Sequence, residues 1–103
     1  MSAEQIKSIY RYVVPIGGHY WITLTGDPIA VAAVDYPAGV EFWAEISDDR
    51  PARRRAFQVY GTGHPVPVSA KWWGTTARTA DGLVWHLYEL AIEDPEQSGE
   101  ASR

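Results

Sequence analysis

The chain has 103 residues, of which 46% are hydrophobic and 13% aromatic, and its formal net charge is −4. This length fits one domain with a core that needs no cross-link, and the lack of cysteine excludes disulfides and thiolate metal sites. The negative charge argues against a protein that coats a nucleic-acid polymer. No apolar run approaches the roughly 20 residues of a membrane span, and the first residues lack the pattern of a signal peptide, so we expect a cytoplasmic protein with no membrane partner.

Taken in order, most of the chain alternates between apolar and polar residues, which is the pattern of half-buried β-strands. Breakers such as Gly17, Gly18 and Pro28 interrupt this alternation at short intervals. Seven strands are predicted, in residues 9–16, 19–25, 29–35, 40–46, 53–60, 71–78 and 83–90. The predicted fold class is therefore all-β, an antiparallel β-sandwich or partly open barrel of about seven short strands.

One strand pairing is predicted from the order of the strands. Strand 53–60 follows strand 40–46 after a polar loop, so we expect the two to pair antiparallel. That pairing would place Arg54 near Glu41 or Glu45, where a surface ion pair contributes at most ~1 kcal/mol.

A second pairing is predicted near the end of the domain. Residues 71–78 and 83–90 are expected to form a hairpin, because Asp81 and Gly82 between them are a recognised hairpin signal. Beyond Ile92 the sequence is acidic and polar and has no periodicity. We therefore predict a single domain in residues 1–92 and a disordered acidic tail in residues 93–103.

The segment Gly-Thr-Gly-His-Pro, residues 61–65, has a composition that only a constrained turn requires. Gly61 and Gly63 can adopt positive φ or let another group approach the backbone, and Thr62 and His64 supply hydrogen-bonding groups. Successive backbone N–H groups in such a loop can bind an anion. We predict a ligand site at Gly61, Thr62, Gly63 and His64; the alternative is a rigid strand-to-strand corner without a ligand.

Four arginines form the basic cluster of the chain, at positions 50, 53, 54 and 55. A guanidinium group matches the geometry of phosphate, so Arg54 is added to the predicted ligand site. The alternative is a solvated loop and strand end whose charge is balanced by nearby carboxylates.

The aromatic residues, with five Trp and six Tyr, exceed what a core of this size needs. In a strand that contains Trp72 and Trp73, the two rings point to opposite faces, and Trp43 shares a face with two glutamates. An exposed Trp stacks on a ligand ring or anchors an interface. Trp73 is therefore added to the ligand site, and self-association, most simply as a dimer, is expected through Trp43, Trp72 or Trp73.

Metal binding and catalysis receive little support. His19, His64 and His86 have no metal-ligand spacing, so we predict no metal and no other cofactor. No serine lies in a nucleophile-elbow context and cysteine is absent, so no catalytic residue is assigned and the protein is not expected to be an enzyme. A general base built from His64 with Asp81 or Glu89 stays open as an alternative, because it depends on the fold.

Several segments together carry a resemblance to a known family. They are Ile9-Tyr10-Arg11-Tyr12, then residues 57–66 with the Gly-Thr-Gly-His-Pro corner, then Gly74-Thr75, then Leu83-Val84-Trp85-His86-Leu87-Tyr88-Glu89. Over roughly residues 9–89 the chain resembles a family of short bacteriophage and prophage proteins. The resemblance implies a phage-encoded accessory protein in the host cytoplasm, with no established catalytic residue to carry over.

Three functions are compatible with this resemblance. Several unrelated small phage proteins sequester nucleotide signals of bacterial immune systems, and by analogy of role we expect binding of a small anionic, nucleotide-like ligand. A structural, assembly or protein–protein interaction module is the alternative, and a small enzyme that uses His64 is the third reading.

Overall fold

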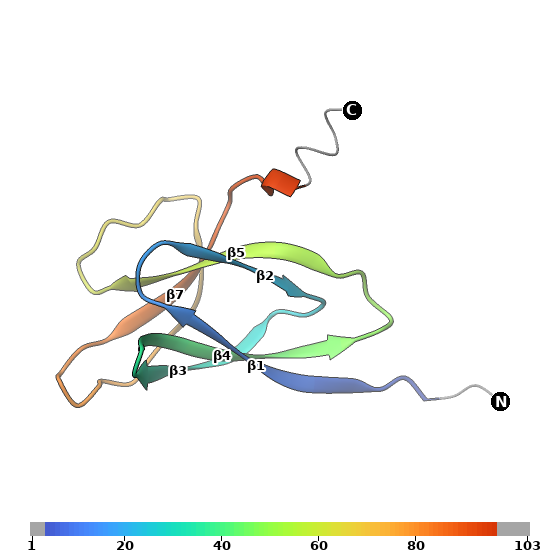
Figure 1. Cartoon of the computed structure of the whole chain (residues 1–103), viewed down its shortest axis with the longest axis horizontal. Coiled ribbons are helices and arrows are strands. Elements are labelled where there is room, and N and C mark those ends of the chain that lie inside the picture. Colours follow the sequence, from blue (N-terminus) through green and yellow to red (C-terminus); the bar gives the residue numbers. More distant parts are fainter. Residues whose placement is uncertain (1–3, 97–103) are drawn as a thin grey trace.

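The computed structural model describes residues 4–96 (Figure 1). The strands are β1 (Lys7–Pro15), β2 (His19–Leu24), β3 (Pro28–Asp35), β4 (Ala38–Ser47), β5 (Arg53–Gly61), β6 (Lys71–Thr75) and β7 (Trp85–Leu90). They form a three-stranded sheet in the order β1-β4-β3 and a four-stranded sheet in the order β2-β5-β7-β6. Every pairing is antiparallel. The predicted all-β antiparallel class is confirmed, and the two sheets make a sandwich.

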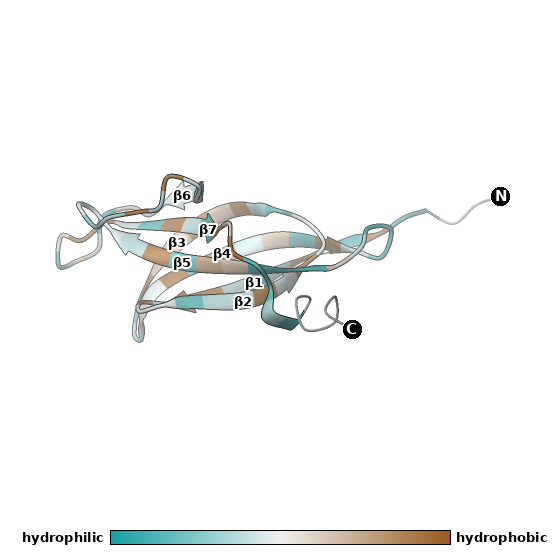
Figure 2. Cartoon of the chain, turned by 90° about the horizontal axis from the view of Figure 1, so that it is seen from above, coloured by the Kyte–Doolittle hydropathy of each residue, from teal (hydrophilic) through white to brown (hydrophobic). Residues whose placement is uncertain are grey.

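The core lies between the two sheets and follows from the period-2 alternation. Phe42 of β4 and Phe57 of β5 are fully buried, and their ring centroids are 5.0 Å apart across the sandwich. Val14, Val40 and Leu87 complete the centre of this cluster. Figure 2 shows brown, apolar bands alternating with teal, polar ones along the strands of both layers. Burying one such aromatic or aliphatic side chain contributes about 1.5–3 kcal/mol, so these residues hold the sheets together.

The predicted pairing between strand 40–46 and strand 53–60 is wrong. β4 pairs with β1 and β3, whereas β5 lies in the other sheet between β2 and β7. Consequently Arg54 does not meet the two glutamates of β4: Glu41 accepts a hydrogen bond from Arg11 at 2.8 Å, and Glu45 accepts one from Lys7 at 2.9 Å. Alternation shows which residues face the core, but it carries no information about which sheet a strand joins.

The predicted hairpin near the end of the chain is confirmed. β6 and β7 pair antiparallel, and the connection between them closes through a turn in which Gly82 donates its N–H to the Thr79 carbonyl at 2.9 Å. Gly82 has a φ of 83°, which glycine adopts at low cost. The strands are shorter than predicted, because residues 76–84 form the connection.

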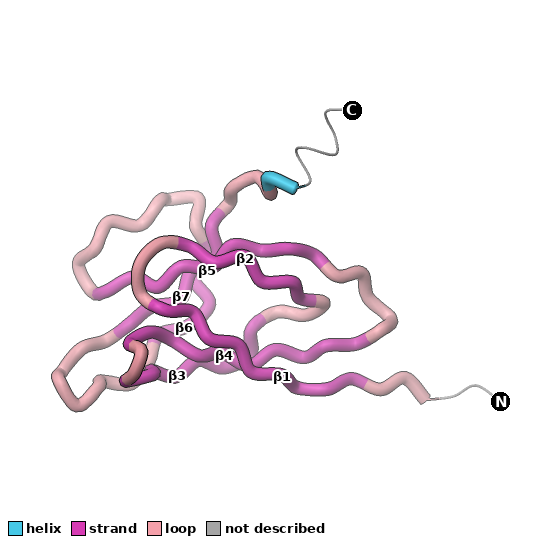
Figure 3. Tube along the Cα trace, viewed as in Figure 1, coloured by secondary structure: helices cyan, strands magenta, loops and turns pink. Residues whose placement is uncertain are grey.

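The connection between β5 and β6 has a different geometry. Both strands pair antiparallel with β7, so they run in the same direction, and residues 62–70 must return along the sheet (Figure 3). Tyr60 points away from the core, since its neighbour Val59 points into it, yet Tyr60 is only 8% exposed. On that side the ring of Tyr88 from β7 packs edge-on against Tyr60, with the ring centroids 5.6 Å apart.

The C-terminal part of the domain leaves the sheet at Leu90. Within the predicted tail, Asp94 and Glu96 pair with Arg54, while residues 97–103 lie outside the described part of the chain. Within residues 4–96 there is no helix of the length and apolarity that crossing a membrane requires.

Candidate functional site

The corner at residues 61–65 is a tight turn fixed by the residues that compose it. His64 donates its backbone N–H to the Gly61 carbonyl at 3.1 Å, and the Gly61 N–H donates to Nδ1 of the His64 ring at 3.2 Å. A Cβ on Gly61 would lie 3.0 Å from Cε1 of His64 and 3.3 Å from Cζ3 of Trp85, and Gly63 has a φ of 91°. The two glycines are thus required for different reasons, close approach at one and backbone conformation at the other.

A chain of hydrogen bonds ties the corner to the sheet. The Thr62 hydroxyl lies 2.9 Å from Nε2 of His86, and Nδ1 of His86 lies 2.9 Å from the Thr75 hydroxyl. Trp72 donates its indole N–H to the same Thr75 oxygen at 2.9 Å. Both nitrogens of His86 are therefore engaged with neutral hydroxyls, and the outer face of β7 holds the corner in place.

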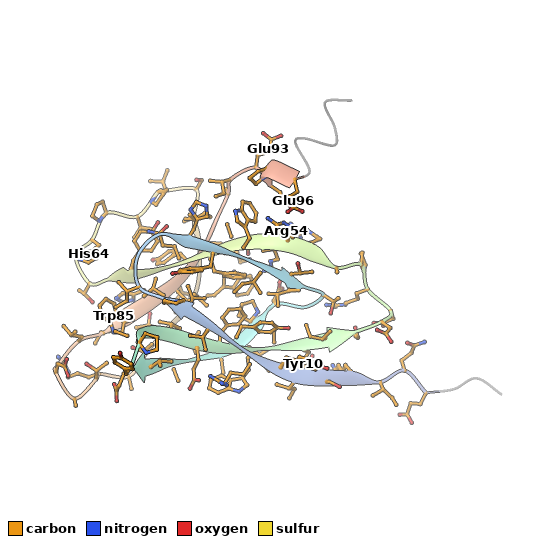
Figure 4. The ribbon with its side chains drawn as sticks, viewed as in Figure 1. Tyr10, Arg54, His64, Trp85, Glu93 and Glu96 are labelled. Carbon is orange, nitrogen blue, oxygen red and sulfur yellow. The ribbon has the colours of Figure 1, made fainter. Side chains whose placement is uncertain are left out.

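Beside the corner lies a depression of about 390 Å³, here called the corner pocket. The residues lining it are Gly61, Thr62, His64, Arg78, Gly82, Leu83, Val84 and Trp85. The pocket forms because the β6–β7 connection packs beside the corner, and Figure 4 shows His64 and Trp85 at this same end of the sandwich.

The lining of the corner pocket includes a positively charged residue and, among residues 4–96, no negatively charged one. Arg78 donates from Nη1 to the Gly82 carbonyl at 3.2 Å, and it forms no ion pair with a carboxylate in the described range 4–96. No acidic residue of that range lines the pocket. An exposed guanidinium that lines one depression together with a Trp and a His ring suits an anion that carries a planar ring.

The structure brings together four of the six residues predicted for the ligand site. Gly61, Thr62 and His64 line the corner pocket, with Gly63 in the same turn. Arg54 lies seven positions earlier on β5, which at ~3.3 Å per residue is over 20 Å away. Trp73 is turned toward Glu89, to which its indole N–H donates at 3.0 Å. Neither residue joins the corner.

The most buried charged residue near Trp73 is Arg55, which is 7% exposed. Its Nε and Nη2 donate to the two carboxylate oxygens of Glu89 at 3.0 and 2.9 Å, and Nη1 donates to the Gly26 carbonyl at 3.1 Å. Asp27 lies 2.9 Å from Nη2. All of these bonds satisfy a buried charge, so this cluster is structural.

The pKa of Glu89 reflects the same contacts. Burial by itself raises the pKa of this carboxyl, but the hydrogen bonds from Arg55 and Trp73 and the charges of Arg55 and Arg53 outweigh burial, so the pKa is lowered. Glu89 is therefore held as a carboxylate, and its hydrogen bonds within residues 4–96 go to Arg55 and Trp73 and not to His64.

Five pocket residues were absent from the predicted site, namely Arg78, Gly82, Leu83, Val84 and Trp85. Leu83 and Trp85 belong to the segment that carries the family resemblance, but alternation marks them only as strand residues. Arg78 stands alone in the sequence, and only the folding of the β6–β7 connection beside the corner reveals it. Among residues 4–96 no group of three or more His, Asp or Glu side chains could hold a metal ion.

Comparison with known proteins gives one match. Residues 5–98 match the family model described as Domain of unknown function (DUF7352). No curated protein and no solved structure matches the chain.

Proposed function

The chain belongs to the family described as Domain of unknown function (DUF7352), and we propose that it binds a small anionic, ring-containing ligand of the nucleotide type in the corner pocket. The observation that carries this proposal is Arg78, a guanidinium without a carboxylate partner in residues 4–96, which lines the same depression as Trp85. The volume of the depression, about 390 Å³, falls in the range typical of small-molecule sites.

In the proposed complex, Trp85, His64 and Arg78 contact different parts of the ligand. The rings of Trp85 and His64 offer stacking surfaces for a base, worth ~1–3 kcal/mol per base in single-strand binders. The guanidinium of Arg78 donates charge-assisted hydrogen bonds to phosphate, each worth ~1.5–3 kcal/mol. The sum reaches micromolar affinity without any chemical step.

The proposed biological role is sequestration of the ligand. The resemblance to short phage proteins supports a protein that holds a nucleotide signal of a bacterial immune system and does not convert it. The Thr62 hydroxyl lies 2.9 Å from Nε2 of His86, which is the geometry of a nucleophile beside a base, so the screen below also checks whether the ligand is chemically changed.

The test is a thermal-shift and native mass-spectrometry screen against linear and cyclic nucleotides. A ligand at 100 times its Kd stabilises the folded state by about 2.7 kcal/mol, which raises the Tm by several degrees. Arg78→Ala and His64→Ala should each abolish most of that shift. Arg11→Ala, which removes the same charge from the other sheet, should leave the shift unchanged. Absence of any shift, or equal losses in all three variants, would refute the proposal; a chemically altered ligand would make the protein an enzyme.

Self-association is the second candidate function, and one observation favours it. Trp72 is 55% exposed, while its indole N–H is fixed to Thr75 at 2.9 Å. A rigid, exposed Trp suits an interface anchor. On this reading Trp72→Ser lowers the sedimentation coefficient at high micromolar concentration and leaves nucleotide binding intact; a wild-type monomer at that concentration would exclude it.

A further inference from the structure

We propose that a second site on the outer face of the four-stranded sheet binds an acidic peptide segment of a partner protein, and that the C-terminal segment of this chain occupies that site in the structure. The site, here called the Arg54 shelf, consists of Trp21 on β2 and Arg54 on β5, which share the outer face. Arg53 on β5 and Lys71 at the start of β6 line the same depression, although strand alternation turns them toward the other face of the sheet. It is independent of the corner pocket, which lies at the other end of β5.

The shelf begins with a stacked pair of side chains. The guanidinium carbon of Arg54 lies 5.2 Å from the centroid of the Trp21 ring. β2 and β5 are paired, with Trp21 opposite Ala56 and Thr23 opposite Arg54, so the backbone fixes both side chains on one face. Stacking holds a guanidinium by its flat surface and leaves its N–H edges free for carboxylates.

Carboxylates of the same chain occupy those N–H edges. Nε of Arg54 donates to Oδ2 of Asp94 at 3.0 Å, and Nη1 lies 3.8 Å from a carboxylate oxygen of Glu96. The Asp94 side chain is only 9% exposed. In Figure 4 Glu96 lies beside Arg54, whereas Glu93 points away from it.

The spacing of the two acidic groups is set by a local turn. Oδ1 of Asp94 accepts the backbone N–H of Glu96 at 3.0 Å, and Pro95 between them starts a helical turn. Asp before Pro at a helix start is a favourable cap. The segment therefore presents two carboxylates, two residues apart, in the arrangement that Arg54 accepts.

The depressions around the Arg54 shelf contain more cationic side chains than the C-terminal segment pairs with. Two depressions, of about 300 and 360 Å³, share Trp21, Arg53, Arg54 and Ile92 in their linings. Neither Arg53 nor Lys71 forms an ion pair with a residue in the described range. A longer acidic segment can thus satisfy cations that residues 94 and 96 leave unpaired.

The chemistry favours an acidic peptide over a nucleic acid. The segment seated on the shelf is itself acidic peptide, with the apolar Ile92 lining both depressions. The net charge of −4 and the sequence pI of about 5.2 oppose the approach of a phosphate backbone. A partner with an apolar residue followed by Asp and Glu would reproduce the observed contacts.

A partner peptide can bind to the Arg54 shelf only when the C-terminal segment has left it. A tethered segment competes at an effective concentration on the order of millimolar. If the segment covers the shelf for about 90% of the time, the apparent affinity for a partner falls about tenfold. Release of residues 94–96 is then the step that exposes the site.

The experiment uses the full chain with Asp94→Asn and Glu96→Gln, which removes both carboxylates and keeps a good cap at position 94. The matched control carries Asp48→Asn and Glu93→Gln, with the same change in charge. The probe is a fluorescein-labelled peptide with the sequence Ala-Ile-Glu-Asp-Pro-Glu-Gln of residues 91–97, and its binding is measured by fluorescence anisotropy. A second peptide has Asn and Gln in place of the acidic residues.

We expect the Asp94→Asn, Glu96→Gln chain to bind the acidic peptide about tenfold more tightly than the wild type and the control variant do. Arg54→Ala in that background should remove the gain, whereas Arg78→Ala should not, which separates this site from the corner pocket. Equal affinities for all variants, binding of the neutral peptide, no effect of Arg54→Ala, or tighter binding of a single-stranded oligonucleotide would each overturn the proposal. An unchanged Tm for Arg54→Ala shows that its loss of binding is not a loss of fold.

Discussion

The arginines near the two ends of β5 are in opposite circumstances. At its beginning, Arg54 and Arg55 are both paired with carboxylates, from Asp94 and Glu89 respectively, which lie 40 and 34 positions away in the sequence. At its end, the corner is built from neutral hydrogen bonds, and the nearby Arg78 has no carboxylate partner within residues 4–96. A run of basic residues is thus not by itself a free basic surface, because the fold supplies its counter-charges.

This difference indicates that the paired Arg55 contributes to the stability of the fold, whereas Arg78 is available for ligand binding. Arg55 is buried, Glu89 is half-buried and the pair is multiply bonded, so loss of one member leaves the other charge without a partner. Arg78 is exposed and touches one carbonyl, so the fold does not depend on its charge. Four predictions test how sharp this division is, in decreasing order of expected effect.

The largest effect is expected for Arg55→Ala. It leaves the half-buried Glu89 carboxylate without its main partner, at a cost of up to about 3–5 kcal/mol, whereas Arg78→Ala should change the free energy of unfolding by less than about 0.5 kcal/mol. Urea denaturation of the two variants measures the contrast. Similar losses in both would show that the division between the two ends does not exist.

A smaller effect is expected from acid. Because contacts in the folded state lower the pKa of Glu89, its contribution is fully present above the unfolded value of about 4.3 and is lost as the pH falls through the folded pKa. Wild-type stability should therefore decline below about pH 4. Glu89→Gln should be less stable at neutral pH and decline less steeply. An identical pH profile for the two proteins would contradict the role assigned to this carboxylate.

At the other end, Gly61→Ala should have an intermediate effect. The new methyl group would meet the His64 ring at 3.0 to 3.2 Å, so the ring must shift and its bond to the Gly61 N–H weakens, at a cost of about 1 kcal/mol. Because the His64 ring lines the corner pocket, nucleotide binding should fall further than stability does. Thermal shift with and without nucleotide separates the two effects, and unchanged binding would show that the ring position is irrelevant.

The smallest effect is expected for Thr75→Val, which removes the oxygen shared by His86 and Trp72. Loss of exposed hydrogen bonds should cost about 0.5–1 kcal/mol. The nitrogen chemical shifts of His86 should change toward a different tautomer balance, since one ring nitrogen loses its partner. A loss above about 2 kcal/mol would mean that this end, too, carries much of the stability.

Much of the secondary structure was predictable from the sequence, and the pairing was not. Alternation and breakers predict all seven strands, including the apolar run at Pro28–Asp35, because side-chain facing is a local property. The partner of β5 depends on which sheet it enters after the polar loop, and no local pattern encodes that choice. The hairpin of β6 and β7 was predictable because its signal, Asp81 with Gly82, lies within the turn itself.

The same limit applies to the candidate site. The corner residues stay together because they are contiguous. Arg54 and Trp73 were assigned from residue type, and the extended β5 strand and the facing of β6 separate them from the corner. Arg78 and Trp85 reach the corner pocket only because the β6–β7 connection folds beside it, which is a long-range property.

The split of β4 and β5 between two sheets also governs how the chain reaches its fold. Of the five strand pairs in the described structure, two are hairpins, β3 with β4 and β6 with β7, and the other three join strands that are remote in sequence. Sandwiches with such high contact order fold in roughly milliseconds to seconds. The corner pocket is complete only once β5 has paired with β7, because residues of both strands line it. A ligand of the corner pocket should therefore slow unfolding and leave the folding rate unchanged.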